Sequence, residues 1–195
     1  LSGINLYTGT TTVGAGTLIA TGNAAALGGG VLTVSGGTLQ LVNDTSLNFG
    51  RVTTVTSGEI DSARNTIGTG VGTTMTLGTL NITGTLNVGL GDTDTTSGIQ
   101  GLTFGLVTLN AAGDTTIITG TTMTNTNASG LLTLGNITSN AKKLTFNVAS
   151  AGRPIAITMG TMADLSGGLT ITAASGLVTL GDIGLGTTGA VTVTN

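Results

Sequence analysis

Few side chains in this sequence could carry out acid–base chemistry. The chain contains no histidine and no cysteine, and its eight acidic residues are scattered. The densest charged group comprises Arg51, Glu59, Asp61 and Arg64. Carboxylates oriented by arginines could cleave a polysaccharide, but no aromatic residue accompanies them as a platform for a sugar. We favour two solvent-exposed salt pairs, each contributing little, and we expect no catalytic residue and no enzymatic activity.

A candidate metal site lies in the glycine-rich segment GLGDTDTTSG, from Gly89 to Gly98. Asp92 and Asp94 supply hard oxygen ligands of the kind that bind Ca²⁺. Calcium-binding β-rolls repeat a nonapeptide several times, whereas this motif occurs once and has no third carboxylate nearby. We favour an acidic turn at a coil corner, with Ca²⁺ at Asp92 and Asp94 as the alternative, and expect no other cofactor.

The basic residues are too few to form a nucleic-acid interface. They are Arg51, Arg64, Lys142, Lys143 and Arg153, and the formal net charge is −3. A protein that binds nucleic acid needs a basic stripe to neutralise phosphates, so we expect no nucleic-acid partner. Lys142, Lys143 and Arg153 could dock another partner, but isolated charges at a strand edge more often discourage unwanted pairing.

Thr-x-Thr units form a surface pattern with its own functional alternative. They occur at Thr54/Thr56, Thr74/Thr76, Thr122/Thr124, Thr170/Thr172 and Thr192/Thr194. Stacked on one flat face, these hydroxyls could order water and bind ice. Because the units are unevenly spaced and mixed with Gly and Asn, we favour the simpler interpretation that Thr satisfies β-propensity on exposed faces.

The composition indicates one all-β domain over residues 1–195. Gly 35, Pro 1, aromatic residues at 2% and charged residues at 7% leave too few large side chains and ion pairs for an ordinary α/β enzyme. The hydrophobic fraction of 38% is too high for disorder. Threonine outnumbers glycine and is a better strand former than helix former, so we expect almost no helix.

Internal repetition predicts how the strands are arranged. SGLLTLGNI, which begins at Ser129, returns as SGLVTLGDI at Ser175, a separation that two coils of roughly 23 residues would explain. Two series of strand units support this spacing. One begins at Val107, Leu132, Ile155 and Val178, and the other at Ile117, Leu144, Leu169 and Val191.

These patterns predict a right-handed parallel β-helix, a β-solenoid of about eight coils of roughly 23 residues. Leu132, Leu134, Val178 and Leu180 should form ladders in its interior, and glycines should supply corners with positive φ. LNITGTLNVG, from Leu80 to Gly89, should add a hairpin or an extra corner. A β-sandwich is disfavoured because the chain lacks Asn-Gly turns and large core aromatics.

The N-terminal segment resembles a known family. LSGINLYTG (Leu1 to Gly9), TTVGAGTL (Thr11 to Leu18) and ALGGGVLTVSGGTL (Ala26 to Leu39) are similar, in order and spacing, to the autotransporter-associated β-strand repeat, also called the passenger-associated transport repeat. The resemblance implies an exported bacterial protein at the outer cell surface or outside the cell. Tyr7 lies in the Y-T-G block of the repeat, and we expect its ring to pack on a neighbouring coil with its hydroxyl at the surface.

We therefore expect a structural extracellular solenoid that builds a stalk, sheath or filament. Neither end shows a cap, so copies or tandem repeats should stack end to end. The alternative is an adhesin that binds host or matrix glycans. No apolar run approaches the length of a membrane-spanning helix, so no transmembrane segment is expected. The chain begins at Leu without Met, as a mature product or a piece of a longer protein would.

Overall fold

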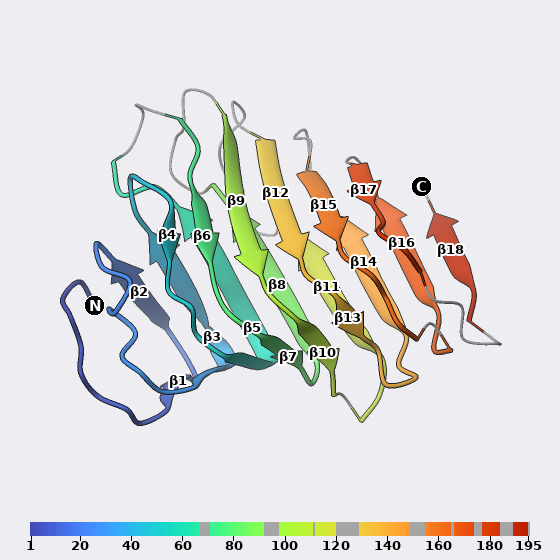
Figure 1. Ribbon diagram of the computed structural model, residues 1–195, viewed down its shortest axis with the longest axis horizontal. Coiled ribbons are helices and arrows are strands. Elements are labelled where there is room, and N and C mark those ends of the chain that lie inside the picture. Colours follow the sequence, from blue (N-terminus) through green and yellow to red (C-terminus); the bar gives the residue numbers. More distant parts are fainter. Residues whose placement is uncertain are drawn as a thin grey trace.

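Alternating apolar and polar residues give this chain short strands that wind into stacked coils. Figure 1 shows the computed structural model, which describes residues 1–66, 71–91, 98–110, 112–119, 129–148, 155–164, 166–173, 177–183 and 189–194. Over these residues the chain forms strands and turns without a helix, and every strand pairing is parallel. The fold is thus an all-β parallel solenoid, as predicted.

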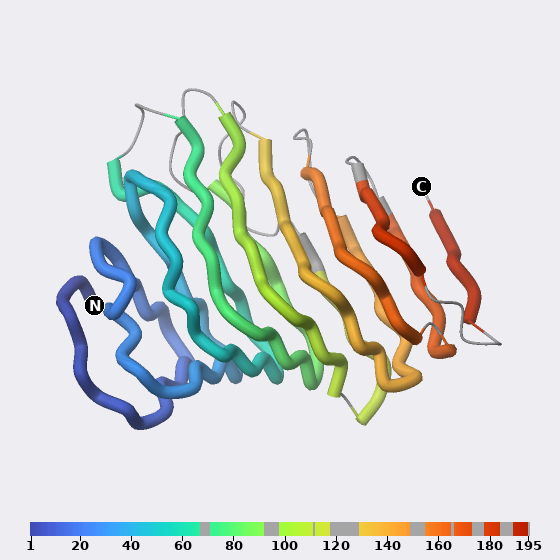
Figure 2. The backbone as a smooth tube through the Cα atoms, viewed as in Figure 1, coloured from blue at the N-terminus to red at the C-terminus, as the bar shows by residue number. Residues whose placement is uncertain are grey.

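The strands lie on three faces, which the chain visits in turn. Face 1 contains β4 (Leu47–Asn48), β6 (Thr74–Thr76), β9 (Ile99–Phe104), β12 (Ser129–Leu134), β15 (Ile155–Met159) and β17 (Leu177–Thr179). Face 2 contains β1 (Thr11–Val13), the first halves of β3 (Leu32–Val42) and β5 (Thr53–Ala63), β7 (Leu80–Ile82), β10 (Val107–Leu109) and β13 (Ile137–Thr138). Face 3 contains β2 (Thr17–Thr21), the second halves of β3 and β5, β8 (Thr85–Leu90), β11 (Thr115–Thr119), β14 (Leu144–Val148), β16 (Leu169–Ala173) and β18 (Val191–Thr194). The coils follow one another along the long axis of the molecule (Figure 2).

The interior is filled by columns, meaning residues at equivalent positions of successive coils. On face 1, Leu132 pairs with Ile157, which pairs with Val178. Leu132 and Leu134 are 0% and 1% exposed, while Val178 and Leu180 pack partly buried against the same core. These four residues therefore belong to stacked interior ladders, as predicted.

Coil length varies more than the sequence suggested. The coil that leads from Thr11 to its partner Leu32 is clearly shorter than the coil that leads from Val107 to its partner Ile137. The longer coil has five residues, 110–114, between β10 and β11, where the shorter coil has three, 14–16, between β1 and β2. It also contains the face 1 strand β12, whereas residues 22–31 of the shorter coil form no strand. Eight coils were predicted from a uniform coil. Face 1 has six strands in the described chain, so about six turns visit all three faces, while face 3 has eight rungs including the second halves of β3 and β5.

The predicted register is correct at some positions and displaced at others. Leu144, Leu169 and Val191 occupy one column, as predicted. Ile117 pairs with Phe146, so it lies two residues from the predicted position.

The other predicted series has two displaced members. Ile155 pairs with Gly130 rather than Leu132, again a displacement of two residues. Val107 belongs to face 2, where it pairs with Leu80. The segment from Leu80 to Gly89 contains a corner rather than a hairpin, because β7 and β8 both pair in parallel with β5.

Glycine allows the backbones of neighbouring coils to touch where face 1 turns into face 2. Gly78, Gly105, Gly135, Gly160 and Gly181 each follow the last inward residue of face 1. The Gly105 N–H donates to the Gly78 carbonyl at 2.9 Å, and the Gly135 N–H donates to the Gly105 carbonyl at 3.0 Å. We call these five residues the glycine column.

The glycine column changes the predicted role of glycine at corners. Gly16 and Gly58, at the turn from face 2 to face 3, have φ values of 68° and 118°, as predicted for corners. No member of the glycine column has a positive φ. At Gly78, Gly135, Gly160 and Gly181 an added Cβ would approach backbone atoms of the preceding coil to 3.0 Å or less, whereas at Gly105 it would come no closer than 3.4 Å.

Replacing Gly135 by Ala should therefore destabilise the fold. The added Cβ would lie 2.7 Å from the carbonyl carbon of Gly105, and closer still to its oxygen. Backbone atoms on both sides must shift, at a cost of about 1–3 kcal/mol or more. Urea unfolding measures the loss, with Gly9→Ala as the control because its Cβ meets nothing within 4 Å. Equal midpoints for the two variants would contradict the proposed role of close backbone contact.

Candidate functional site

The structure places the predicted charged group at three separate positions. Arg51 lies at the turn from face 1 to face 2, where its Nε donates to the Phe49 carbonyl and its Nη1 to the Gly28 carbonyl, at 2.8 and 2.6 Å. Glu59 and Asp61 lie on β5 in face 3, and Gln40 Nε2 donates to Asp61 Oδ2 at 2.9 Å. Arg51 thus braces a corner of the backbone and orients no carboxylate there.

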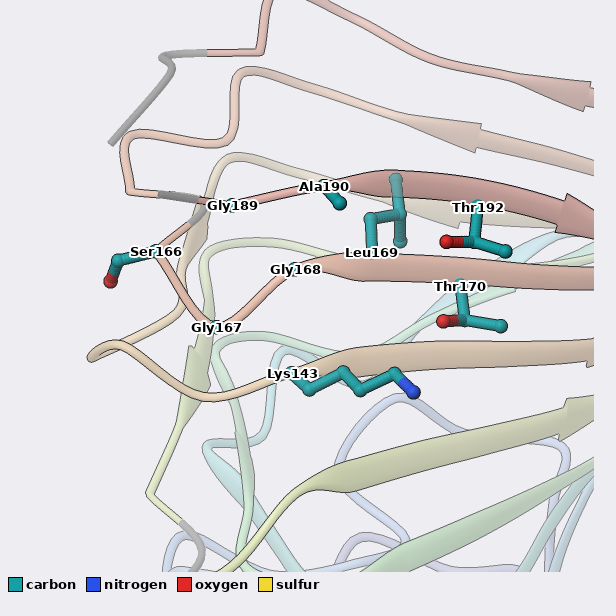
Figure 3. A pocket seen from close by; sticks show the side chains of 9 residues that line it. All are labelled: Lys143, Ser166, Gly167, Gly168, Leu169, Thr170, Gly189, Ala190 and Thr192. Atoms are coloured by element: carbon teal, nitrogen blue, oxygen red, sulfur yellow. The ribbon is translucent and has the colours of Figure 1, made fainter. Parts of the chain in front are cut away.

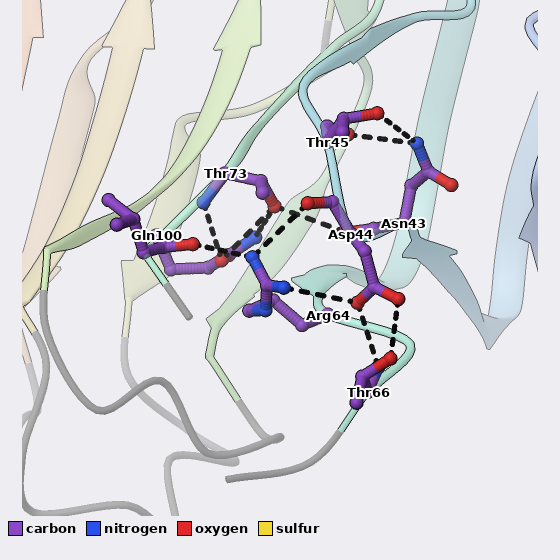
Figure 4. A network of polar contacts seen from close by, with 8 residues as sticks. Asn43, Asp44, Thr45, Arg64, Thr66, Thr73 and Gln100 are labelled. Atoms are coloured by element: carbon purple, nitrogen blue, oxygen red, sulfur yellow. Dashed lines mark hydrogen bonds and ion pairs between the residues drawn. The ribbon is translucent and has the colours of Figure 1, made fainter. Parts of the chain in front are cut away.

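The prediction of solvent-exposed salt pairs is wrong for two members of the group. Asp61 is 1% exposed and Arg64 is 8% exposed. Arg64 follows β5, where the chain leaves face 3, and its Nη2 lies 3.4 Å from Asp44 Oδ1. Its Nη1 donates to the carbonyls of Asp44 and Val71, at 3.2 and 2.5 Å. The guanidinium therefore ties successive turns together at this edge (Figure 4).

Asp44 holds the outer end of this network. Its Oδ1 accepts the Thr66 N–H at 2.8 Å, and its Oδ2 accepts the Thr66 hydroxyl at 2.5 Å. The hydroxyl bond, then the amide bond, hold the pKa of Asp44 below its ordinary value of 3.8, with a smaller contribution from the Arg64 charge. A similar motif occurs at Asp164, where hydrogen bonds from the Ser166 amide and hydroxyl lower the pKa of the carboxyl.

A second polar group is enclosed beside this network. Gln100 and Ser62 are 0% exposed, and Thr73 is 5% exposed. Gln100 Nε2 donates to Ser62 Oγ at 2.8 Å, Gln100 Oε1 accepts the Thr73 N–H at 3.1 Å, and Ser62 Oγ donates to the Gly101 carbonyl at 2.7 Å. Each of these side chains has a hydrogen-bond partner, so the group fastens β5 to β9 inside the solenoid.

No group of three acidic side chains suited to a metal ion occurs within the described residues. Asp92 and Asp94, the predicted Ca²⁺ ligands, lie outside that part of the chain, as do Arg153 and the unit Thr122/Thr124. The calcium alternative at Asp92 and Asp94 stays a prediction.

A groove of about 280 Å³ opens on face 3 near the C-terminal end. Leu144 and Leu169 are paired, so Lys143 and Gly168 lie side by side on the outward side of face 3, where Gly168 itself is buried. Lys143, Ser166 and Thr170 border the groove (Figure 3). Thr192, on β18, presents its hydroxyl beside that of Thr170, and the Lys143 side chain runs along its own strand (Figure 3).

The chemistry available in this groove is binding rather than proton transfer. Its lining consists of three hydroxyl side chains, one ammonium group, glycines, Ala190 and Leu169. A threonine hydroxyl needs an adjacent base before it acts as a nucleophile, and no lining residue supplies a carboxylate or an imidazole. These groups can donate hydrogen bonds to a polar or anionic ligand.

Threonine forms one column on the outside of every face. Face 1 carries Thr76, Thr103, Thr133, Thr158 and Thr179; face 2 carries Thr12, Thr33, Thr54, Thr108 and Thr138, with Asn81 between Thr54 and Thr108; face 3 carries Thr85, Thr116, Thr145, Thr170 and Thr192. Beside the last of these columns, Thr172 and Thr194 are also paired, and their hydroxyl oxygens are 3.1 Å apart. The described Thr-x-Thr units are thus spread over different faces, an arrangement that β-propensity explains.

Tyr7 and the two lysines have structural contacts. The Tyr7 ring lies against Gly28, where an added Cβ would be 2.5 Å from Cε2, and the hydroxyl is 2.9 Å from Thr11 Oγ1. The ring therefore packs on the neighbouring coil with its hydroxyl at the surface, as predicted. Lys142 Nζ donates to the Ala112 carbonyl at 3.4 Å, and the Lys143 amide donates to Asp114 Oδ1 at 3.1 Å.

Comparison with family models, with curated proteins and with solved structures finds no match for this chain. The class that the fold defines is therefore β-solenoid, without assignment to a family. No helix within the described residues has the length and apolarity needed to cross a membrane.

The Asp44 network predicts a pH-dependent stability. The folded pKa of Asp44 lies below the unfolded value, so its contribution is complete above the unfolded pKa and is lost as the pH falls through the folded pKa. Asp44→Asn should lower the urea midpoint at about pH 7 but have little further effect at about pH 2. The exposed carboxylate variant Asp182→Asn controls for removal of a negative charge. An Asp44→Asn deficit of equal size at both pH values would contradict this assignment.

Proposed function

We propose that this chain is a structural β-solenoid that builds an extracellular bacterial stalk, sheath or filament by end-to-end stacking, without catalytic activity. The observation that carries the proposal is the exposure of the inward-facing residue on the last rung, meaning the last strand of a face. Ile117 and Phe146 are 0% exposed and Ile171 is 5% exposed, but Val193, next in the same column, is 68% exposed. The core column continues to the end of the described chain and is left uncovered there.

The N-terminal end is also apolar and incompletely paired. Among the described strands, β2 has one neighbour, β3. Leu1, Ile4 and Leu6, in the first segment of the chain, are 46%, 69% and 85% exposed. Both ends therefore present apolar side chains next to strand edges, which are the features that pair with another strand.

Charged side chains are concentrated away from both ends. None occurs in residues 1–43, and Asp182 is the single one in residues 165–195. Proteins that must stay monomeric commonly place Lys, Pro or inward-pointing charges on exposed strand edges. The near absence of charged side chains from these two segments supports end-to-end association.

The proposed location rests on the N-terminal blocks that resemble the autotransporter-associated β-strand repeat. Tyr7 of the Y-T-G block packs on Gly28 of a later block, which gives the order of these segments a structural reason within this chain. We propose on this basis that the protein is exported to the bacterial surface.

Negative-stain electron microscopy and sedimentation velocity test the assembly. The chain should form linear particles whose length grows with protein concentration. Val193→Lys would place an ammonium group where the next core layer must form, and it should leave monomers with an unchanged melting curve because Val193 is exposed in the single chain. Thr192→Lys, on the outer side of the same strand, is the matched control and should still assemble. A wild-type chain that stays monomeric at high concentration would overturn the proposal.

The groove at Lys143 supports a second candidate function, an adhesin that binds glycans. Hydroxyls of Ser166, Thr170 and Thr192 can hydrogen-bond sugar hydroxyls, and the Lys143 ammonium can pair with a carboxylate or sulfate. The groove lacks the aromatic residues that dominate most binding hot spots, which places this candidate second.

Binding of acidic oligosaccharides distinguishes the two candidates. If the groove is a glycan site, Lys143→Met should weaken binding about tenfold or more, as loss of a charged hydrogen bond predicts. Lys142→Met should bind normally, because that ammonium contacts a backbone carbonyl away from the groove lining. Absence of binding on a glycan array, or an equal loss in both variants, would eliminate the adhesin candidate.

A further inference from the structure

One column of paired positions runs through the whole of face 3. It consists of Thr17, Thr38, Glu59, Asn87, Ile118, Asn147, Thr172 and Thr194. It begins on β2 and ends on β18, the two edge strands of this face. Thr17 and Thr194 are both exposed, and each has a described partner on one side alone.

The first residues of the chain cover only part of the outer edge of β2, the edge opposite β3. The Leu1 amino group donates to the Ile19 carbonyl at 2.6 Å, and the Thr21 N–H donates to the Leu1 carbonyl at 2.9 Å. Leu1 therefore covers the C-terminal part of β2, while Gly16 and Thr17 stay exposed. A strand that ends at Thr17 would fit beside Leu1 without displacing it.

The strand β18 of another copy could pair beside Thr17 in the register that the column already shows. In the register of the column, Thr194 would lie beside Thr17, the first residue of β2, and Val193 would lie beside Gly16 in the corner that precedes β2. Gly16 has no side chain and leaves open space within 4 Å, which can receive the exposed Val193 side chain.

The coils at the two ends also have equal length. Leu32 follows Thr11 at the N-terminal end by the same number of positions as Ile183 follows Met162 at the C-terminal end. A longer coil, from Val107 to Ile137, lies between them. In coil length, the two ends of the solenoid therefore match one another, whereas the coil from Val107 to Ile137 is longer than either.

We propose that the open position beside Thr17, at the start of β2, is occupied by β18 of a second copy of this chain, in parallel and head to tail, with Thr194 of one copy beside Thr17 of the next. This inference rests on the proposed function and specifies the polarity and register of its joint. The joint would repeat the contact already made by Thr172 and Thr194, whose hydroxyl oxygens are 3.1 Å apart. A heterologous contact of this kind does not close on itself and generates an open filament.

Disulfide cross-linking tests the joint directly, because the chain has no cysteine of its own. In the double variant Thr17→Cys/Thr194→Cys, the paired Cα atoms of adjacent copies would lie about 4.8 Å apart, within the range that a disulfide bridges. Mild oxidation should give a ladder of dimers, trimers and higher multimers on a non-reducing gel. Reduction should return the material to a single band.

Two controls make the result specific. Thr17→Cys/Thr192→Cys moves one partner by two positions, to a Cα separation of about 8 Å, and should not cross-link. Thr194→Cys alone should stay monomeric on the gel, since a head-to-tail joint brings two different positions together.

Dimers from Thr194→Cys alone would show a tail-to-tail joint, and multimers from the Thr192 variant would show another register. Either result would overturn the proposed joint. If microscopy shows filaments but Thr17 and Thr194 do not cross-link, the proposed joint is wrong and the proposed end-to-end assembly is still supported. If no filaments form, both the joint and the assembly are wrong.

Discussion

The structure depends on how closely the backbones of successive coils approach. Parallel pairing sets their spacing on the faces, and the corners must follow the same spacing although their turns differ in length. Where face 1 turns into face 2, the glycine column meets this requirement, since Gly105 and Gly135 have no Cβ and hydrogen-bond directly through their backbones. The faces can then remain in register even though the coils themselves vary in length.

The fold class could be predicted because repetition and alternation are both properties of the sequence. Leu132 and Val178 are separated by two coils in the structure, as predicted. Ile117 and Ile155 were displaced by two residues because such a shift keeps every apolar side chain on the inner face, so that alternation alone does not distinguish the two registers. The predicted eight coils equal the described rungs of face 3 but exceed the six strands of face 1, because coil length alone does not show which faces each coil visits.

The candidate sites were less predictable than the fold, since each depends on residues from different coils. The groove at Lys143 is lined by residues of three successive rungs, of which Gly168 and Thr192 belong to later coils. Arg51 and Arg64 were grouped with the acidic residues of β5 by their proximity in sequence, but a corner separates Arg51 from the rest. Arg64 and Gln100 are enclosed where the chain leaves face 3, and the hydrogen bonds that they donate to other segments of the chain offset the cost of burying them.

The central claim is that parallel stacking is incomplete at both ends of the chain and is completed by another copy. Hydrogen–deuterium exchange measured at low and high protein concentration tests this most directly, because β18 lacks a described neighbouring strand on one side and the outer edge of β2 is paired by Leu1 at Ile19 and Thr21 alone. The account predicts that amides in both strands become slower to exchange as particles assemble, while those in β12 and β14 are protected at every concentration. Assembled particles in which β2 and β18 exchange as fast as in the monomer would contradict it.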